Sequence, residues 1–189
     1  MTMRVISGKA KGRRLKVVPG IGTRPIMDRV KEALFSILGQ RIPESSFLDL
    51  YAGTGSVGIE ALSRGATCAV FVENARIAQR TIEENLASTG LAGGVIVKDD
   101  VRAYLRRPPP ENLAGGAEII YIAPPQYLNL WAETLAILDQ NPAHIAPDGL
   151  IIVQIDPTEK GAISLTNLRE TQERRYGNTL LWFFERPGE

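Results

Sequence analysis

The clearest chemical pattern in the chain is a set of glycines and acids between residues 47 and 73. An apolar run containing the acid Asp49 leads into three closely spaced glycines: Gly53, Gly55 and Gly58. Glycines let the backbone come close to a ligand, and the helix start that follows offers free N–H groups. A second apolar run ends in Glu73, where an acid suits the two hydroxyls of a ribose. The pattern predicts half of a nucleotide-type binding site.

The ligand class follows from the position of Asp49. The glycine spacing satisfies the G-x-G-x-x-G fingerprint of dinucleotide sites. A carboxylate at the end of the preceding strand would repel a pyrophosphate but would attract an ammonium group. S-adenosylmethionine (SAM) carries such an ammonium on its methionine end and has no phosphate. The residues therefore favour SAM, with a dinucleotide and a purely structural glycine turn as the alternatives.

A parallel sheet would bring these residues together. Apolar runs predict strands at 47–51, 69–73, 94–98, 118–122 and 149–155, and helices at about 57–64, 75–89 and 128–140. This alternation predicts an α/β, Rossmann-like fold with a mainly parallel sheet and helices on both faces. Ligands of such sheets bind beyond the carboxyl ends of the strands. Asp49, Glu73, Asp99 or Asp100, and Ala123 all fall at such ends.

The two ends of the chain are predicted to add smaller elements. Residues 168–176 and 178–185 indicate two strands joined at Gly177-Asn178, which would add an antiparallel edge and complete a seven-stranded sheet. Such an edge is typical of the common methyltransferase fold and not of ordinary dinucleotide domains. Residues 4–7 and 14–18 indicate a small hairpin, and a helix is predicted from about Pro25 to Leu38.

Charge is concentrated at the start of the chain. Residues 1–31 hold nine lysines and arginines against one acid, a net charge of +8, whereas the whole chain carries +1. A basic arm on a slightly acidic body is the electrostatic pattern of a nucleic-acid-binding protein. The alternative is an ordinary solvated surface. The candidate RNA contacts are Arg4, Lys9, Lys11, Arg13, Arg14, Lys16, Arg24 and Arg29.

Other site classes find little support in the composition. The single cysteine, Cys68, excludes an intramolecular disulfide, and its apolar setting favours a buried, inert thiol. The single histidine, His144, cannot build a metal site, and no metal is expected. No apolar run approaches the length of a membrane span, and the N-terminus has no apolar signal core. We expect a soluble cytoplasmic protein, with a monomer favoured.

Three segments resemble a known family. They are RVISGKAKGRRL, RPIMDRVKEALFSIL and LDLYAGTGSVGIEALSRGA. Together they resemble the bacterial small-subunit ribosomal RNA guanine-N2 methyltransferases of the RsmD type, over nearly the whole chain. The resemblance implies SAM as the methyl donor, an RNA guanine as the acceptor and a partly assembled small ribosomal subunit as the partner. It also implies a basic extension at residues 1–40 and a SAM-dependent methyltransferase domain at 41–189.

The resemblance implies roles for individual residues of the cofactor site. The glycine loop would cradle the methionine end of SAM through Asp49, Tyr51, Ala52, Gly53, Thr54 and Gly55. Glu73, with Asn74 beside it, would bind the ribose hydroxyls. Asp100, followed by Val101, would hold the adenine amino group, and Asp99 is the neighbouring alternative.

The chain departs from the family pattern at the predicted acceptor site. The family has an acid or amide, two prolines and an aromatic residue, whereas this chain has Ala123-Pro124-Pro125-Gln126-Tyr127. We expect this loop to form the catalytic site, with backbone carbonyls and the Gln126 amide oxygen as acceptors and Tyr127 stacking on the base. The alternatives are a proline turn that merely ends a strand, a non-catalytic SAM- and RNA-binding assembly factor, and a nicotinamide-dependent oxidoreductase.

Overall fold

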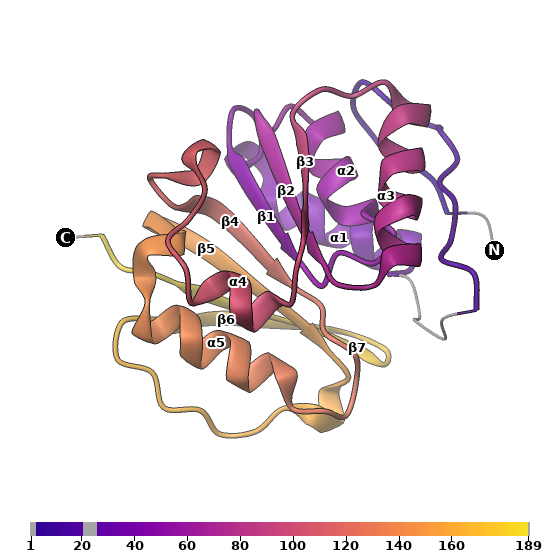
Figure 1. The fold of residues 1–189 in the computed structure, drawn as a ribbon. Coiled ribbons are helices and arrows are strands. Elements are labelled where there is room, and N and C mark those ends of the chain that lie inside the picture. Colours follow the sequence, from indigo (N-terminus) through magenta and orange to yellow (C-terminus); the bar gives the residue numbers. More distant parts are fainter. Residues whose placement is uncertain (1–2, 21–25, 189) are drawn as a thin grey trace.

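In the computed structural model, which describes residues 3–20 and 26–188, the chain forms a mixed seven-stranded sheet (Figure 1). The strand order is β3-β2-β1-β4-β5-β7-β6. The strands are β1 Ser46–Leu50, β2 Cys68–Glu73, β3 Gly94–Lys98, β4 Ala117–Ile122, β5 Ile145–Ile155, β6 Arg169–Tyr176 and β7 Thr179–Glu185. Strands β3, β2, β1, β4 and β5 are parallel, whereas β7 pairs antiparallel with both of its neighbours, β5 and β6. The predicted fold class is confirmed.

Helices cover both faces of the sheet (Figure 1). One face packs against α1 Asp28–Leu38, α2 Ser56–Ser63 and α3 Arg76–Thr89; the other packs against α4 Val101–Leu105 and α5 Leu130–Gln140. Short 3-10 turns lie at Gly39–Arg41, Glu111–Leu113, Pro142–His144 and Pro157–Glu159. A hydrophobic core lies on each face of the sheet. Alternate strand residues belong to one core or the other, because side chains along a strand point to opposite faces. Thus Phe47 lies in the first core and Leu48 in the second.

Two elements differ from the sequence prediction. Strand β5 begins at Ile145 rather than at residue 149, and its pairing with β4 shifts register between Ala117 and Ile119. Helix α4 was not predicted, because five residues are too few to show a helical period. Its first turn is stabilised by Asp100, whose side chain accepts hydrogen bonds from two backbone N–H groups of the helix.

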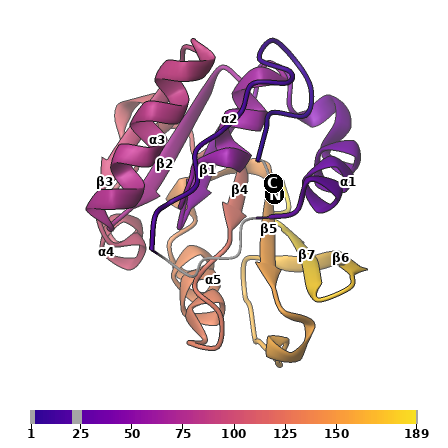
Figure 2. The ribbon, with the colours of Figure 1, turned by 90° about the vertical axis from the view of Figure 1, so that its right-hand side faces the viewer.

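The start of the chain pairs over a shorter stretch than the predicted hairpin. Residues 4–7 and 14–18 form no regular strands, and a single antiparallel bridge joins Arg4 to Arg14. Much of the hydrogen bonding of this segment goes to α2 instead. Lys9 N–H donates to the carbonyl of Ser63, and Ala10 N–H donates to the Ser63 hydroxyl. Figure 2 shows the segment running across α2, between α1 and α3.

Glu60 of α2 anchors the same segment through a buried carboxylate. It accepts hydrogen bonds from the backbone N–H groups of Ile6 at 2.8 Å and Ser7 at 3.0 Å, and from the Arg64 guanidinium at 2.8 Å. Lys31 of α1 lies 3.5 Å away and also donates to the carbonyl of Arg4. Both Glu60 and Lys31 are fully buried, so one of the nine basic residues near the N-terminus is part of the interior rather than of the surface.

The N-terminal segment also shares its apolar core with the sheet. Met3, Val5, Ala10 and Leu15 lie in the cluster that contains the buried faces of α1 and α2. The division of the chain at residue 40 stays a prediction. Among the described residues, no helix has both the length and the apolar character needed to cross a bilayer.

The Glu60 cluster generates a stability prediction. Glu60→Gln should lower the free energy of unfolding by about 3–5 kcal/mol, because Lys31 would be left buried without a counter-charge. Urea denaturation of the two proteins measures the difference. Glu84→Gln is the matched control: Glu84 pairs with Lys16 at 2.9 Å on the exposed surface, where such pairs contribute under about 1 kcal/mol. Equal losses in the two variants would contradict the assigned role of Glu60.

Candidate functional site

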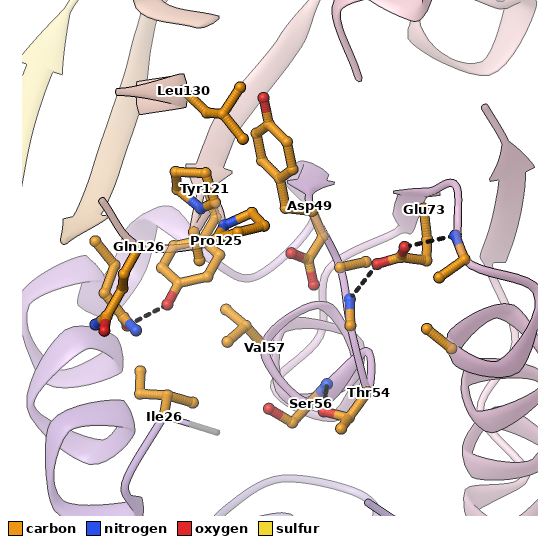
Figure 3. Close-up of a pocket in the computed structure, with 18 of the residues that line it drawn as sticks. Ile26, Asp49, Thr54, Ser56, Val57, Glu73, Tyr121, Pro125, Gln126 and Leu130 are labelled. Atoms are coloured by element: carbon orange, nitrogen blue, oxygen red, sulfur yellow. Dashed lines mark hydrogen bonds between the residues drawn. The ribbon is translucent and has the colours of Figure 1, made fainter. Parts of the chain in front are cut away.

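A cavity of about 690 Å³ opens at the carboxyl ends of the parallel strands (Figure 3). It lies where the strand order reverses, with β2 on one side of β1 and β4 on the other. This is the place where open α/β sheets bind ligands. The cavity is lined by most of the residues that the sequence singled out: Asp49, Tyr51, Ala52, Gly53, Thr54, Glu73, Asn74, Asp100, Ala123, Pro124, Pro125 and Gln126. Gly55, Asp99, Val101 and Tyr127 are not among its lining residues.

Asp49 is the buried acid of this cavity. Its side chain, at the end of β1, is almost fully buried, yet it lines the open space (Figure 3). Gly58 N–H donates to its Oδ2 at 3.0 Å, and within the described residues no donor reaches Oδ1. Burial raises the pKa of Asp49 to about 8; the bond from Gly58 opposes this shift and the charge of Glu73 adds to it. A cation in the cavity would therefore find a carboxylate oxygen with no other partner.

Glu73 holds the glycine loop in place. Its two oxygens accept hydrogen bonds of 2.9 Å from the backbone N–H groups of Gly53 and Ala75. Both Gly53 and Gly55 adopt positive φ angles, which glycine tolerates readily. Each carboxylate oxygen has a second lone pair, so Glu73 can still accept hydrogen bonds from a pair of hydroxyls.

Gly58 allows α2 to pack closely on the sheet and does not line the cavity. A Cβ atom at this position would lie 2.4 Å from the ring of Phe71 on β2. The absence of a side chain therefore lets α2 lie directly against the sheet, and this places the Gly58 N–H beside Asp49. Gly58, the third glycine of the motif, therefore affects the site indirectly, by setting where α2 lies relative to Asp49.

The two neighbouring acids after β3 have different surroundings. Asp100 lines the cavity and accepts bonds from the backbone of Arg102 at 2.9 Å and of Ala103 at 3.2 Å. Partial burial acts to raise the pKa of Asp100, but hydrogen bonds from Arg102 and Ala103 outweigh it and lower the pKa. Asp99 pairs with Arg107 and lines only a small adjoining hollow of about 20 Å³. Asp100 is the better placed of the two for a ligand of the main cavity.

The loop after β4 reaches the cavity only in part. Ala123 and Pro124 are at least half-buried, whereas Pro125 and Gln126 are exposed at the rim. Tyr127 is 67 % exposed, and its backbone N–H donates to Glu159 at 2.7 Å. The charge of Asp156, which follows β5, raises the pKa of Tyr127. The Tyr127 side chain therefore lies beside the end of β5. The structure thus brings Gln126 to the cavity but leaves Tyr127 outside its wall.

Among the polar residues of the cavity wall that sequence reasoning missed are Tyr121 and Gln154. The Tyr121 hydroxyl donates a hydrogen bond to the Gln154 side-chain oxygen. Burial and the nearby charge of Asp49 hold the pKa of Tyr121 well above its ordinary value. Tyr121 lies in an apolar run that looks like ordinary core. Gln154 could have been noticed, because it is the one polar side chain in the otherwise apolar stretch Leu150–Ile155.

Cys68 and His144 lie outside the cavity wall. Cys68 is half-buried, and burial raises the pKa of its thiol, which disfavours the reactive thiolate. His144 is fully buried, and its Nε2 lies 2.8 Å from the carbonyl of Arg107. Burial lowers the pKa of His144, so the ring is neutral in the interior.

Comparison with known proteins assigns the chain to a family. A family model described as "Conserved hypothetical protein 95" matches residues 3–185. "Ribosomal RNA small subunit methyltransferase D" of Escherichia coli (strain K12) is 34% identical over 153 residues, or 80% of this chain and 74% of that protein. This chain belongs to the RsmD family.

Two further proteins match this chain over almost its full length. "Putative rRNA methyltransferase YlbH" of Bacillus subtilis (strain 168) is 33% identical over 98% of this chain and 100% of that protein. The solved structure "Putative methyltransferase yhhF from Escherichia coli" is 29% identical, has a TM-score of 0.84 and covers 100% of both chains. The likeness to these proteins therefore extends over almost the whole of this chain, and a nicotinamide-dependent oxidoreductase is not favoured.

The basic segment of this RsmD family member lies near the cavity. Six of the predicted RNA contacts, Arg4, Lys9, Lys11, Arg13, Arg14 and Lys16, are exposed, as is Arg29 on α1, whereas Arg24 lies outside the described residues. Asn85 of α3 joins the segment to the glycine loop. Its amide accepts from Lys16 N–H at 2.7 Å and donates to the carbonyl of Thr54 at 2.9 Å. The segment also reaches the cavity wall through Val18.

The raised pKa of Asp49 generates a pH prediction for the free protein. Because the folded-state pKa of about 8 lies above the ordinary value of the unfolded chain, ionisation of Asp49 opposes folding. Its contribution to stability is complete below about pH 4 and is lost as the pH rises through 8. Asp49→Asn should therefore be more stable than wild type above pH 8, by on the order of 2–4 kcal/mol, and equal to it near pH 4.

Thermal and urea unfolding between pH 4 and 9 would measure this difference. Glu83→Gln is the control, because Glu83 pairs with Lys98 on the exposed surface and should show no comparable pH-dependent gain. A difference between Asp49→Asn and wild type that stays constant over the whole range would show that Asp49 is not an unfavourably buried charge.

Proposed function

We propose that this chain is a SAM-dependent methyltransferase that modifies the exocyclic N2 amine of a guanine in small-subunit ribosomal RNA. The observation that carries the proposal is the buried carboxylate of Asp49, which faces a large cavity at the switch point of an RsmD-family sheet. Relatives of this chain are named as methyltransferases of ribosomal RNA, which supports the substrate class.

The residues present fit SAM. Asp49 offers Oδ1 to the ammonium of the methionine end, and that cation would offset the burial that raises the pKa of the acid. Glu73 can accept from the ribose hydroxyls, and Asp100 is placed for the adenine amine. When bound, SAM supplies a methyl group on a positively charged sulfur, and the chain's own part is to bind and orient the two reactants.

The acceptor side is assigned to the loop Ala123-Pro124-Pro125-Gln126-Tyr127. Backbone carbonyls of the proline loop and the Gln126 amide would accept hydrogen bonds from the target base. Stacking by Tyr127 remains part of the proposal and requires the side chain to turn from its present exposed position. The target base must leave its stack to enter the cavity, so an accessible base of the RNA is expected.

The RNA partner is assigned to the basic segment at residues 4–18 together with Arg29. Within residues 3–20 and 26–188, salt bridges engage Arg4 and Lys16 but not Lys9, Lys11, Arg13 or Arg14. These four cations are therefore available for phosphates. A ribosomal partner also places the protein in the cytoplasm.

A second function is motivated by Ala123, which removes the expected acceptor side chain. The chain could bind SAM and RNA as a ribosome-assembly factor without transferring a methyl group. Labelled methyl transfer from SAM to undermethylated small ribosomal subunits separates the two functions. Incorporation at a guanine N2, located by mass spectrometry of the digested RNA, supports the enzyme; binding of both partners without incorporation supports the assembly factor.

The cofactor assignment predicts the effect of two substitutions on SAM affinity. Asp49→Ala should weaken binding by about 1.5–3 kcal/mol, the size of a hydrogen bond to a charged group. Glu73→Ala should also weaken it, through the ribose contacts and the glycine loop. Titration calorimetry measures both. Asp156→Ala is the control, because this half-buried acid does not line the cavity. Unchanged affinity in both test variants would remove the site assignment.

The RNA assignment predicts a charge-reversal phenotype. Reversal of Lys9, Lys11, Arg13 and Arg14 should weaken RNA binding and flatten its salt dependence, because each phosphate contact releases roughly 0.7–0.9 counterions. SAM affinity should be unchanged. The matched control reverses four exposed cations elsewhere: Arg76, Arg80, Lys98 and Arg106. Filter binding at several salt concentrations would refute the assignment if both sets lost the same affinity and slope.

A further inference from the structure

A polar pair lies in the cavity beside the position where the expected acceptor side chain is missing. Strand register places Tyr121 of β4 next to Asp49 of β1, and both lie on the face covered by α2. Ala123 and Gln154 lie on the same face, because they follow Tyr121 and Ile152 by two residues on neighbouring strands. Tyr121, Ala123 and Gln154 all line the cavity.

The hydrogen bond between the two side chains determines which atoms face a ligand. The Tyr121 hydroxyl donates a hydrogen bond to Gln154, so its oxygen can still accept one from a donor in the cavity. Figure 3 shows this hydroxyl directed away from β4, toward the side of the cavity that holds Gln126 and Val57. The tyrosine ring is 2 % exposed and held by the core, so the oxygen is fixed in position.

We propose that the Tyr121 hydroxyl is a catalytic group that accepts a hydrogen bond from the exocyclic amine of the target base, in place of the side chain absent at Ala123. Gln154 is a positioning residue that orients this hydroxyl. The inference rests on the proposed function. It also narrows the substrate class, because a hydroxyl whose hydrogen is committed to Gln154 suits an amine donor and not a carbonyl or an unprotonated ring nitrogen.

The hydroxyl would act as an acceptor and not as a base. Its lone pair draws an amine hydrogen away, which leaves more electron density on the nitrogen. The nitrogen forms the new N–C bond as the S–C bond breaks, sulfur leaves as a neutral thioether, and the extra proton on nitrogen passes to water. Because burial holds the pKa of Tyr121 well above its ordinary value, no phenolate is available to take that proton.

The first test removes only the oxygen. Tyr121→Phe should lower kcat for methyl transfer to undermethylated small ribosomal subunits by about 10–100-fold, because it removes a hydrogen bond that strengthens in the transition state. SAM affinity and the KM for the subunits should change by less than about twofold. Tyr104→Phe is the matched control. The Tyr104 hydroxyl, on α4 and outside the cavity wall, is buried with no hydrogen-bond partner among residues 3–20 and 26–188, and its loss should leave kcat unchanged.

Two further variants separate a role in chemistry from a role in folding. Gln154→Leu should lower kcat, whereas Gln154→Glu should retain most of it, because a carboxylate can still accept the tyrosine hydrogen. Ala123→Asn introduced into Tyr121→Phe should restore activity, because it returns an acceptor to the adjoining position. Tyr127→Ala, measured beside them, reports the contribution of the exposed ring.

The outcomes distinguish this inference from the proposed function. Methyl transfer by wild type together with full kcat in Tyr121→Phe would overturn the inference and leave the function standing. A wild-type protein that transfers no methyl would overturn both. If Tyr121→Phe also lost SAM affinity, Gln154→Leu would decide: a reduced kcat with normal SAM affinity supports the inference, and an unchanged kcat overturns it.

Discussion

The buried carboxylate of Glu60 sets the geometry on which both parts of the site depend. It gathers the backbone N–H groups of Ile6 and Ser7, the ammonium of Lys31 and the guanidinium of Arg64 around a single residue of α2. An uncompensated buried charge would cost several kcal/mol, so these groups are held to one arrangement. Because α2 begins directly after the glycine loop, one short helix positions the cofactor loop at its start and the basic segment one turn later.

Asp49 is a second buried acid, but it has far fewer hydrogen-bond donors around it than Glu60. Glu60 has four donors around it, whereas among the described residues only the N–H of Gly58 reaches Asp49, which lines the open cavity. Ionisation of Asp49 is therefore unfavourable in the free protein, and this raises its pKa to about 8. A cationic ligand would favour the charged form of Asp49, so ligand binding and ionisation of this acid would favour each other. Such local cost at a binding site is common in proteins.

The sequence predicted the sheet well and individual side chains less well. Buried parallel strands appear as continuous apolar runs, so β1, β2 and β4 could be placed together with the acids at their ends. Contacts between distant segments left no such signal. Lys31 looked like one more surface cation until its pairing with Glu60 was seen, and Gly58 looked like a ligand contact although it packs on Phe71. The orientation of Tyr127 depends on a bond to Glu159, 32 residues away.

The carboxyl edge of the sheet offers more than one way to place a polar atom against the same ligand. Parallel register aligns Asp49 and Tyr121 on one face, and Gln154 follows on the next strand. With only a methyl group at Ala123, Tyr121 two residues earlier and Gln154 one strand across are polar side chains of the same part of the cavity wall. A hydroxyl fixed by an amide can take over an acceptor role there, because the rigid core already holds it. The chemistry of such a site therefore depends on the arrangement of the strand ends and not on a single side chain of the loop.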